Sequence, residues 1–399
     1  MTTPATLAVA QRATKAQSSY RYLVTNLLTG ALVADWIPLV VSSCSRQLNG
    51  IGTLTGTLTL DQANPRLNSI YIAAMEPRKS VLWVLQDNKP IWNGIIWNWS
   101  PETILNGAPL PIGASTIESL FQYRQISDDL SFTNADILDI FRGLIAYAVA
   151  KQPNGQVSGL TVQPTESGIT DTIAYAGADL GKVFDAMNNL IGLAGFEYAF
   201  TPAIDVNGDL ITIVQLGYPT LGLTAAQSQL AFNFPGNLMD YLKQRTGAQA
   251  ANRLVATAPG TNVDANGNTI PWTSQLPNGE DLIDLGNGYP LMEDSISYQG
   301  TVAITQQSQI DAFANGVLPA RTGAQETPQL ILGANEFPKL HSINVGDGCT
   351  FAATSPLDPA GPNGQPGLQV TGRIVGWTLT PPAGTQIEQV ALQLGAFAS

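Results

Sequence analysis

The chain contains one histidine, His341, in the segment Lys-Leu-His-Ser-Ile-Asn-Val-Gly-Asp at 339–347. A serine or cysteine nucleophile with an imidazole base would have to use this residue, because the histidine accepts the proton of the nucleophile. No Gly-x-Ser-x-Gly elbow and no His-Glu-x-x-His helix accompanies it, and three-histidine zinc chemistry is impossible. We therefore interpret His341 as an ordinary strand or loop residue.

Paired carboxylates are the remaining route to catalysis, since two of them can hydrolyse a glycoside without histidine or cysteine. Acids at a helix start favour the helix dipole, and acids in a loop add solubility. We expect such structural roles for the candidate groups, although spacing along the chain does not give the distance between two carboxyls. The candidates are Asp128 and Asp129 before a predicted helix, Asp136 and Asp139 on it, and an acidic loop with Glu280, Asp281 and Asp284.

Three further motifs match ligand sites only in part. In the segment 50–56 (Gly-Ile-Gly-Thr-Leu-Thr-Gly), the third glycine is one residue late for a dinucleotide fingerprint, and a predicted strand follows where a helix is required. The segment Asp-Val-Asn-Gly-Asp at 205–209 lacks the downstream glutamate of a calcium loop, so we expect a hairpin turn. Trp92, Trp97 and Trp99 fall in one apolar strand and predict core and subunit contacts rather than a sugar platform. We predict no enzyme, no catalytic, cofactor-binding or metal site, and no cofactor.

Charge and composition exclude other classes of protein. Lys and Arg number 18 against 30 Asp and Glu, a formal charge of −12, and only 12% of the 399 residues are charged. A protein that grips DNA needs cations to replace the counterions of the phosphates, so this class is disfavoured. An apolar content of 44% excludes global disorder, and the length suggests two to four domains.

The two cysteines, Cys44 and Cys349, form neither a disulfide framework nor a metal motif, and we expect them to be small buried residues. No segment has the length of a signal sequence core or of a membrane span. We therefore expect a soluble chain that is made in a cytoplasm and has no stable membrane insertion.

The elements that must position these residues are mainly strands. Asn and Gln number 52 and exceed the 48 charged residues, and 38 glycines and 26 prolines interrupt the chain, which is typical of strands and turns. Alternation predicts strands at 20–25, 52–60, 81–85 and 91–99, the last two joined as a hairpin. The glycines at 52–56 predict bulges or close backbone approach.

The middle of the chain changes to helical spacing. Apolar residues predict a helix after a Thr or Asn cap at 133–134, and a second helix from about Asp179 to near Gly195. A hairpin joins 196–200 to 210–216, and later come a polar loop at 259–280, a weak helix at 306–317 and strands at 368–379 and 389–394. The fold class is thus α+β, mainly β.

Two segments recur in the same order along the chain. Residues 56–62 resemble 300–306, and Gly94-Ile-Ile-Trp-Asn-Trp99 resembles Gly372-Arg-Ile-Val-Gly-Trp377 in the form Gly-x-Ile-x-x-Trp. The larger spacing of the second pair would follow from an insertion, which indicates two related β domains. Chance similarity of two glycine-containing strands is the alternative.

These residues resemble a family. A Tyr-rich strand at 20–25, Leu-Asn-Gly-Ile-Gly-Thr-Leu at 48–54 and the hairpin Asp-Asn-Lys-Pro-Ile-Trp-Asn-Gly-Ile-Ile at 87–96 look like minor tail proteins of long-tailed bacteriophages of actinobacteria. The closing segments 338–347, 372–377 and 390–394 are similar too. More broadly, the chain resembles the baseplate hub, or tail-associated, proteins at the tail tip.

The resemblance implies two related β-barrel-like tube domains with a small α/β module between them. Its predicted boundaries are a flexible N-terminal arm at 1–17, a first tube-type β domain at 18–118, the α/β module at 119–222 and a second tube-type β domain with peripheral loops at 223–399. Three copies would supply six β domains to a ring that continues the tail tube. The chain reaches Ser399 without a fibre or hydrolase segment, so receptor binding and wall cleavage would belong to other proteins.

The resemblance also implies partners and a location. A homotrimer in the virion tail tip would contact the distal tail protein ring, the tape measure protein and other tip or fibre proteins, with DNA only as passing cargo. An acidic, amide-rich wall binds phosphates weakly, so we expect few Lys or Arg on lumen-facing strands. Two other functions stay open: a carbohydrate-binding adhesion protein, and a cell-wall glycosidase that would use Asp128 or Asp284.

Overall fold

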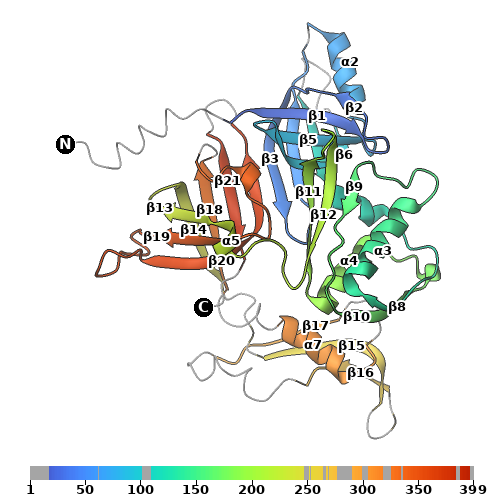
Figure 1. The fold of residues 1–399 in the computed structure, drawn as a ribbon. Coiled ribbons are helices and arrows are strands. Elements are labelled where there is room, and N and C mark those ends of the chain that lie inside the picture. The colour runs from blue at the N-terminus through green and yellow to red at the C-terminus, as the bar shows by residue number, and fades with distance from the viewer. Residues whose placement is uncertain are drawn as a thin grey trace.

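A single large sheet organises the chain, as the computed structural model shows (Figure 1). Its 13 strands follow the order β14-β18-β21-β20-β3-β4-β7-β6-β5-β1-β2, with β13 and β19 attached at β20. The prediction of a mainly β, α+β fold is confirmed, and among the described residues this sheet is open rather than closed into a barrel. The structure describes residues 18–61, 63–100, 109–246, 251, 253–263, 267, 269–275, 290–298, 304–317, 325–333, 336–382 and 387–395.

The first half of the sheet comes from the N-terminal part of the chain, and its predicted strands and hairpin are confirmed. We call β1 and β3–β7 the first β unit. This part of the chain contains β1 (Tyr20–Asn26), β2 (Leu32–Ala34), β3 (Leu39–Gln47), β4 (Thr53–Leu58), α2 (Pro65–Ala74), β5 (Ser80–Gln86), β6 (Lys89–Trp99) and β7 (Leu110–Thr116).

Strand β5 is buried on both faces, which explains its unbroken apolar sequence. Leu82 and Val84 face a core that also contains the second half of the sheet, whereas Val81 and Trp83 face a core shared with the helices. Side chains alternate between the faces of a strand, so each parity serves a different core. The first β unit is thereby fixed to both of its neighbours.

The glycine at 52 allows close backbone approach, as the sequence predicts. A Cβ atom at Gly52 would lie 3.0 Å from the carbonyl carbon of Ser45 and closer still to its oxygen. Gly94 has the same role on β6, where a Cβ would lie 2.6 Å from the carbonyl carbon of Ser115. Only glycine fits at these two positions.

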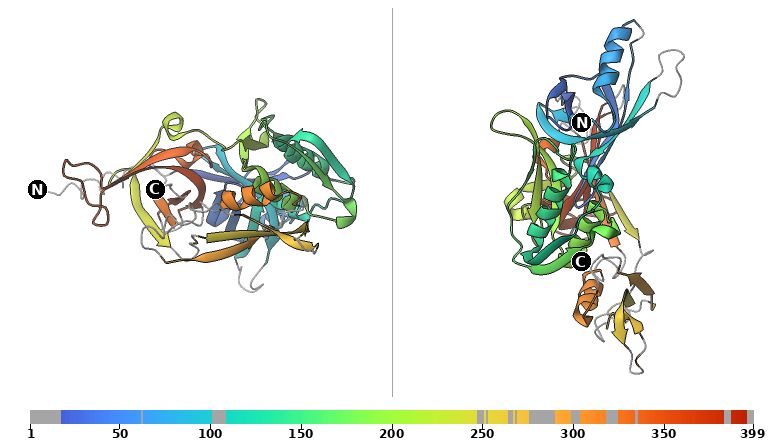
Figure 2. Two further views of the ribbon diagram at one scale, coloured as in Figure 1. Left: turned by 90° about the horizontal axis from the view of Figure 1, so that it is seen from below. Right: turned by 90° about the vertical axis from the view of Figure 1, so that its right-hand side faces the viewer.

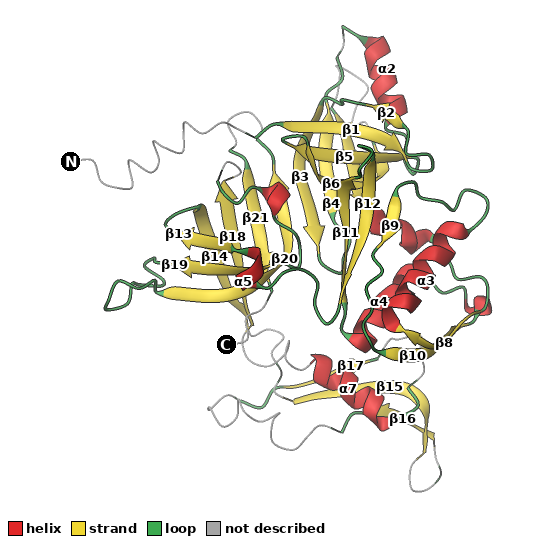
Figure 3. Ribbon diagram, viewed as in Figure 1, coloured by secondary structure: helices red, strands yellow, loops and turns green. Residues whose placement is uncertain are grey.

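The middle of the chain forms two small sheets covered by two helices (Figure 3). Its elements are η1 (Ile117–Tyr123), β8 (Leu130–Asp136), α3 (Ile137–Ala150), β9 (Leu160–Val162), β10 (Thr170–Tyr175), η2 (Gly177–Asp179), α4 (Val183–Ala194), β11 (Glu197–Ile204) and β12 (Leu210–Gly217). The predicted helices and the β11–β12 hairpin are confirmed, and Gly195 ends α4 in the left-handed conformation.

The predicted Thr or Asn cap of the first helix is wrong. Asp136 caps α3 by accepting a hydrogen bond from the amide of Leu138, while Thr133 and Asn134 belong to β8. The periodicity placed the helix correctly, but the preceding residues pair with β10 and so delay the start of the helix.

The last part of the chain forms the second half of the large sheet. We call β13, β14 and β18–β21 the second β unit. Its elements are α5 (Ala225–Ser228), β13 (Leu230–Phe234), β14 (Leu238–Thr246), β18 (Gln325–Gly333), η5 (Leu340–Ser342), β19 (Gly348–Ala353), β20 (Leu368–Thr380) and β21 (Gln389–Leu394). The predicted strands at 368–379 and 389–394 are confirmed as β20 and β21.

A small sheet with one helix lies between β14 and β18 in the sequence, below the rest in Figure 1. It contains β15 (Arg253–Val263), β16 (Thr269–Thr273), β17 (Glu293–Ser297) and α7 (Gln307–Val317), with its own core. The predicted helix near 306–317 is confirmed. The polar loop expected at 259–280 is corrected, because β15 and β16 pair there as a hairpin.

The two β units have the same strand order. Lettering the six strands of each unit a to f in chain order, both sheets read b-c-f-e-d-a, with β3-β4-β7-β6-β5-β1 in one and β14-β18-β21-β20-β19-β13 in the other. The four ladders from b to d are antiparallel in both units, and only the d–a pair differs, being parallel in the second. The small sheet is an insertion between strands b and c.

The bulges of the two units also coincide. The ladder between e and f shifts register between Ile96 and Asn98 in β6, and between Ile374 and Gly376 in β20. These are the same positions of the Gly-x-Ile-x-x-Trp segments, so the segments lie in equivalent strands. For the other proposed pair, 300–303 lies outside the described residues and 304–306 precedes α7 without forming a strand, contrary to the strand expected there.

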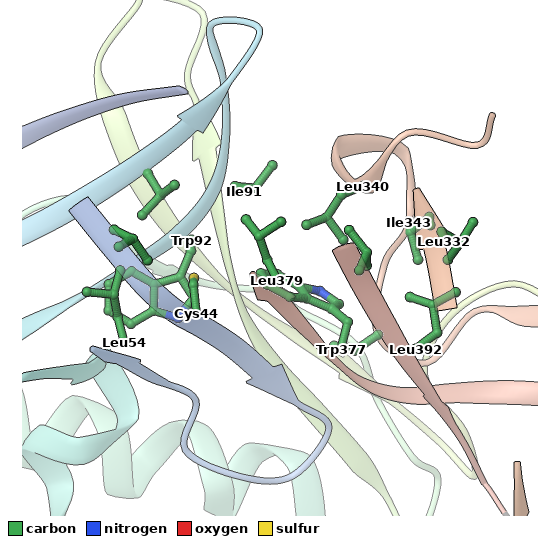
Figure 4. Close-up of a cluster of buried hydrophobic side chains, with 14 of the residues drawn as sticks. Cys44, Leu54, Ile91, Trp92, Leu332, Leu340, Ile343, Trp377, Leu379 and Leu392 are labelled. Atoms are coloured by element: carbon green, nitrogen blue, oxygen red, sulfur yellow. The ribbon is translucent and has the colours of Figure 1, made fainter. Parts of the chain in front are cut away.

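One hydrophobic core runs through both β units, as Figure 4 shows. Trp92, Cys44 and Leu54 gather in the first unit, and Trp377 with Leu392 in the second. The two units lie side by side, and the views in Figure 2 place the small sheet at the opposite end of the molecule from α2. The two units therefore share one core and one continuous sheet.

Candidate functional site

The feature that most distinguishes this molecule is the junction where both β units and the α/β module meet. Strand β20 pairs antiparallel with β3, from Gly376 opposite Gln47 to Leu379 opposite Cys44. This ladder joins the two six-stranded units. It covers the free edge of β3 and the part of β20 that extends beyond its ladder with β19. We therefore take the junction as the candidate functional site.

Arg46 on β3 fastens the first unit to the hairpin of the α/β module. Its side chain is buried and donates hydrogen bonds to the carbonyl oxygen of Phe200 at 2.7 Å and to Thr201 Oγ1 at 3.0 Å. Burial lowers the pKa of Arg46 to about 10, and the nearby Glu118 carboxyl opposes that shift. Burial also raises the pKa of Glu118 to about 7. Among the described residues, Glu118 Oε2 has no hydrogen-bond partner.

Arg373 on β20 fastens the second unit to the same strand, β11. Its guanidinium donates to both carboxylate oxygens of Glu197, at 2.7 Å for Oε1 and 2.5 Å for Oε2, and to the carbonyl oxygen of Leu221 at 2.7 Å. A two-pronged contact of this kind fixes orientation as well as distance. These hydrogen bonds to Glu197 are the main reason that the pKa of Arg373 is raised.

A second polar contact between the units lies at the start of the described chain. The Tyr20 hydroxyl donates to Glu388 Oε1, and Gln86 Nε2 donates to the Tyr20 oxygen at 3.1 Å. Lys339 and Asp87 form an ion pair beside them at 2.5 Å. Glu388 is 3% exposed, and burial raises its pKa to about 7. Tyr20, Gln86 and Glu388 come from β1, β5 and the segment before β21, whereas Asp87 follows β5 and Lys339 precedes η5.

The carboxylate candidates that lie in the described residues each contact nearby groups of the chain. Asp128 accepts a hydrogen bond from the Tyr147 hydroxyl at 2.7 Å, and Asp129 accepts one from the amide of Gly177 at 2.8 Å. Asp136 caps α3 and also accepts from the amides of Ser167 and Gly168. Asp139 pairs with Arg142 one turn further on. Each side chain thus holds local structure. Glu280, Asp281 and Asp284 lie outside the described residues.

The histidine and the cysteines are placed as structural residues. His341 lies in η5, its backbone amide donates to Gln86 Oε1 at 3.2 Å, and burial lowers the pKa of its imidazole. Cys44 and Cys349 are free and fully buried, which confirms the prediction, and burial raises the pKa of Cys349 to about 12. Buried thiols that stay protonated are poor nucleophiles.

The remaining motifs are structural as well. Asp205 accepts hydrogen bonds from the amides of Asn207 and Asp209 at 2.8 Å in the predicted hairpin turn. No group of three or more metal-ligating side chains occurs in the part of the chain that the structure describes. Trp92 is buried, as predicted, and donates to the carbonyl of Ser45 at 2.9 Å, whereas Trp97 and Trp99 are half-buried.

A cleft of about 900 Å³ lies between β1 and the β11–β12 hairpin. Its walls carry Leu23, Leu85 and Ile211, with Arg21 and Asp205 among the polar groups. No tryptophan, tyrosine or phenylalanine lines it, so it lacks the ring faces on which sugars stack. None of the helices in the described ranges is long and apolar enough to cross a membrane.

Sequence reasoning missed the polar residues that matter most, which are Arg46, Glu118, Glu197, Arg373 and Glu388. Each is an isolated charge in its own segment, and Arg373 meets Glu197 across 176 residues of chain. The one available signal was a single charged residue within a strand that carries no other charge, as at Arg46 and Arg373.

Comparison with solved structures identifies the fold. The 43 kDa tail protein of prophage MuSo2 from Shewanella oneidensis superposes with a TM-score of 0.56 at 12% identity, covering 94% of this chain and 98% of that one. The tail protein from Neisseria meningitidis MC58 gives a TM-score of 0.54 at 11% identity, covering 95% and 97%. The chain has the fold of phage tail proteins.

A third tail protein agrees with the first two. Prophage tail protein gp18 from Listeria monocytogenes EGD-e gives a TM-score of 0.51 at 12% identity, covering 94% of each chain. The predicted resemblance to phage tail proteins is thereby confirmed for the fold, and the likeness to proteins of actinobacterial phages stays a prediction. No protein-family model and no curated protein matches the sequence.

Proposed function

We propose that this chain is a structural, non-catalytic hub of a phage tail tip, located in the virion. The observation that carries the proposal is the tail-protein fold over almost the whole chain, in which two β units of the same strand order form one continuous sheet. Three copies would arrange six such units as a ring that continues the tail tube. Paired strand edges would hold the ring together without any chemistry.

The domain boundaries belong to the same proposal. We infer a first tube-type domain at 18–118, an α/β module at 119–222 and a second tube-type domain at 223–399, interrupted by the small sheet. The shared strand order and the coincident bulges support a relation between the two β units. The hydrogen bonds of Arg46 to Phe200 and of Arg373 to Glu197 would hold the α/β module against both units.

The proposed partners are the distal tail ring, the tape measure protein and tip or fibre proteins, with DNA as passing cargo. The acidic composition supports DNA as passing cargo, because a wall with few Lys and Arg side chains binds the phosphate backbone weakly and does not slow its passage. We propose that lumen-facing strands carry neutral or acidic side chains.

A reconstruction of the tail tip of particles that contain this chain tests the proposal. The expected result is three copies in a six-fold-like ring with a lumen poor in Lys and Arg. Absence of the chain from the tail, or a basic lumen, would contradict it. Incubation with cell-wall polymer tests the non-catalytic role, and we expect wild type and Asp128→Asn to leave the polymer equally intact.

A further inference from the structure

The edge contact inside one chain suggests the contact between chains. Strand e of the second unit, β20, pairs with strand b of the first unit, β3. The matching strands of the opposite units are β6, which is strand e of the first unit, and β14, which is strand b of the second. If the two units are equivalent, the contact between strand e of one unit and strand b of the next can repeat around a closed ring of copies.

We propose that the end of β6 in one copy pairs antiparallel with β14 of a second copy. The partner that covers the edge of β14 is thus another copy of this chain. The inference rests on the proposed assembly of several copies and names its interface. It makes the contact between copies a repeat of the β20–β3 junction.

Strand β6 has the extension that this pairing requires. Its ladder with β5 runs from Lys89 opposite Gln86 to Ile95 opposite Val81, so Asn98 and Trp99 lie beyond the end of that ladder. In the second unit, the ladder of β20 with β19 ends at Arg373, and the residues beyond it, from Gly376, pair with β3. Among the described residues, no strand pairs with this side of β6 at Asn98 and Trp99.

Strand β14 matches β3 in detail. The ladder between b and c shifts register between Val41 and Ser43 in β3, and between Leu238 and Asp240 in β14. Aligning these bulges places Leu242 at the position of Ser45 and Gln244 at that of Gln47. In the described sheet β14 is the terminal strand, and Leu242 is 50% exposed, as expected for a side chain at an interface.

The register of the proposed contact follows from the junction within the chain. Gly376 lies opposite Gln47, and their equivalents are Asn98 and Gln244. Ser100 corresponds to Thr378 and would lie opposite Leu242, the equivalent of Ser45. Directly opposite residues on antiparallel strands have Cβ atoms about 5 Å apart, within reach of a disulfide after small adjustment.

Cysteine cross-linking of the full chain tests this register. We expect Asn98→Cys/Gln244→Cys, on mild oxidation with diamide, to give covalent multimers up to the trimer, because each copy offers one thiol at each edge. Each single variant should give no such series. The pair Asn98→Cys/Leu357→Cys is the matched control, since Leu357 is 68% exposed on a loop outside β14. The native cysteines are buried and should not interfere.

A charge pair provides a second measurement on exposed positions that should not affect folding. Ser100→Lys/Leu242→Lys places like charges opposite each other, and Ser100→Glu/Leu242→Lys places opposite ones. Sedimentation should show association stronger by up to about fivefold per contact for the second pair.

Cross-linking of Asn98→Cys/Gln244→Cys no greater than that of the Leu357 control would overturn the strand pairing, as would equal association of the two charge pairs. A wild-type chain that stays monomeric up to its solubility limit would overturn it as well. The proposed role in the tail is tested separately from the strand pairing, because it is contradicted if the chain is absent from the reconstructed tail.

Discussion

Replacing Arg373 with glutamine should loosen the α/β module from the second β unit. The substitution removes a two-pronged ion pair with Glu197 and a hydrogen bond to the carbonyl of Leu221. The side chains of Arg373 and Glu197 are 32% and 16% exposed, so solvent screens the pair only in part. Breaking a fully buried pair costs about 3–5 kcal/mol, and this exposure reduces the expected loss of unfolding free energy to about 2 kcal/mol.

The matched control is Arg21→Gln in the first β unit. Arg21 and Asp35 are 45% and 75% exposed, with 3.9 Å between Nη2 and Oδ2. Exposed pairs contribute little, so we expect a loss below about 0.5 kcal/mol that vanishes at high salt, whereas the Arg373 effect should persist. Urea unfolding followed by tryptophan fluorescence measures both losses.

A double-mutant cycle separates the ion pair from other contacts. Combined with Glu197→Gln, the Arg373→Gln variant should show a coupling free energy of about 1 kcal/mol or more. Hydrogen exchange at the amide of Leu221, which donates to Glu197 Oε2 at 2.7 Å, should accelerate in Arg373→Gln. Equal losses of unfolding free energy for Arg373→Gln and Arg21→Gln, or a coupling free energy near zero, would refute the role of the Arg373–Glu197 ion pair in holding the module to the second β unit.

Three further outcomes follow from the same structure. Gly94→Ala should lower the unfolding free energy by about 2–3 kcal/mol, because its Cβ would lie 2.5 Å from Trp92; Gly192→Ala on α4, with nothing within 4 Å, should raise it by up to about 1 kcal/mol in the same urea titration. Buried Glu388 holds its proton up to a pKa of about 7 in the folded chain, against 4.5 for the free side chain, so its contribution to stability should fall as pH rises from 4.5 to about 7. Glu388→Gln should flatten that slope in thermal melts across this range, and an unchanged slope would contradict the assignment. Glu118→Gln should flatten it in the same way, since the pKa of Glu118 is also about 7.

Much of the local structure was predictable because its causes are local. The alternation of Leu54 and Leu58 with threonines gave β4, and the polar loop between two apolar runs gave the β5–β6 hairpin. Prediction went wrong in two places where polar segments pair as strands. The start of α3 moved to Ile137 because β8 pairs with β10, and the expected loop at 259–280 became the β15–β16 hairpin.

The sequence by itself determined that the chain is β-rich and poor in charge, and that Gly94–Trp99 and Gly372–Trp377 share one pattern. Only the tertiary structure decided that these segments occupy equivalent strands, that β20 joins β3, and that Arg373 meets Glu197. Periodicity depends on residues a few positions apart. Strand order and buried ion pairs depend instead on which distant segments pack against each other and bury their apolar surface. The packing of distant segments produces no periodic pattern that can be recognised in the sequence.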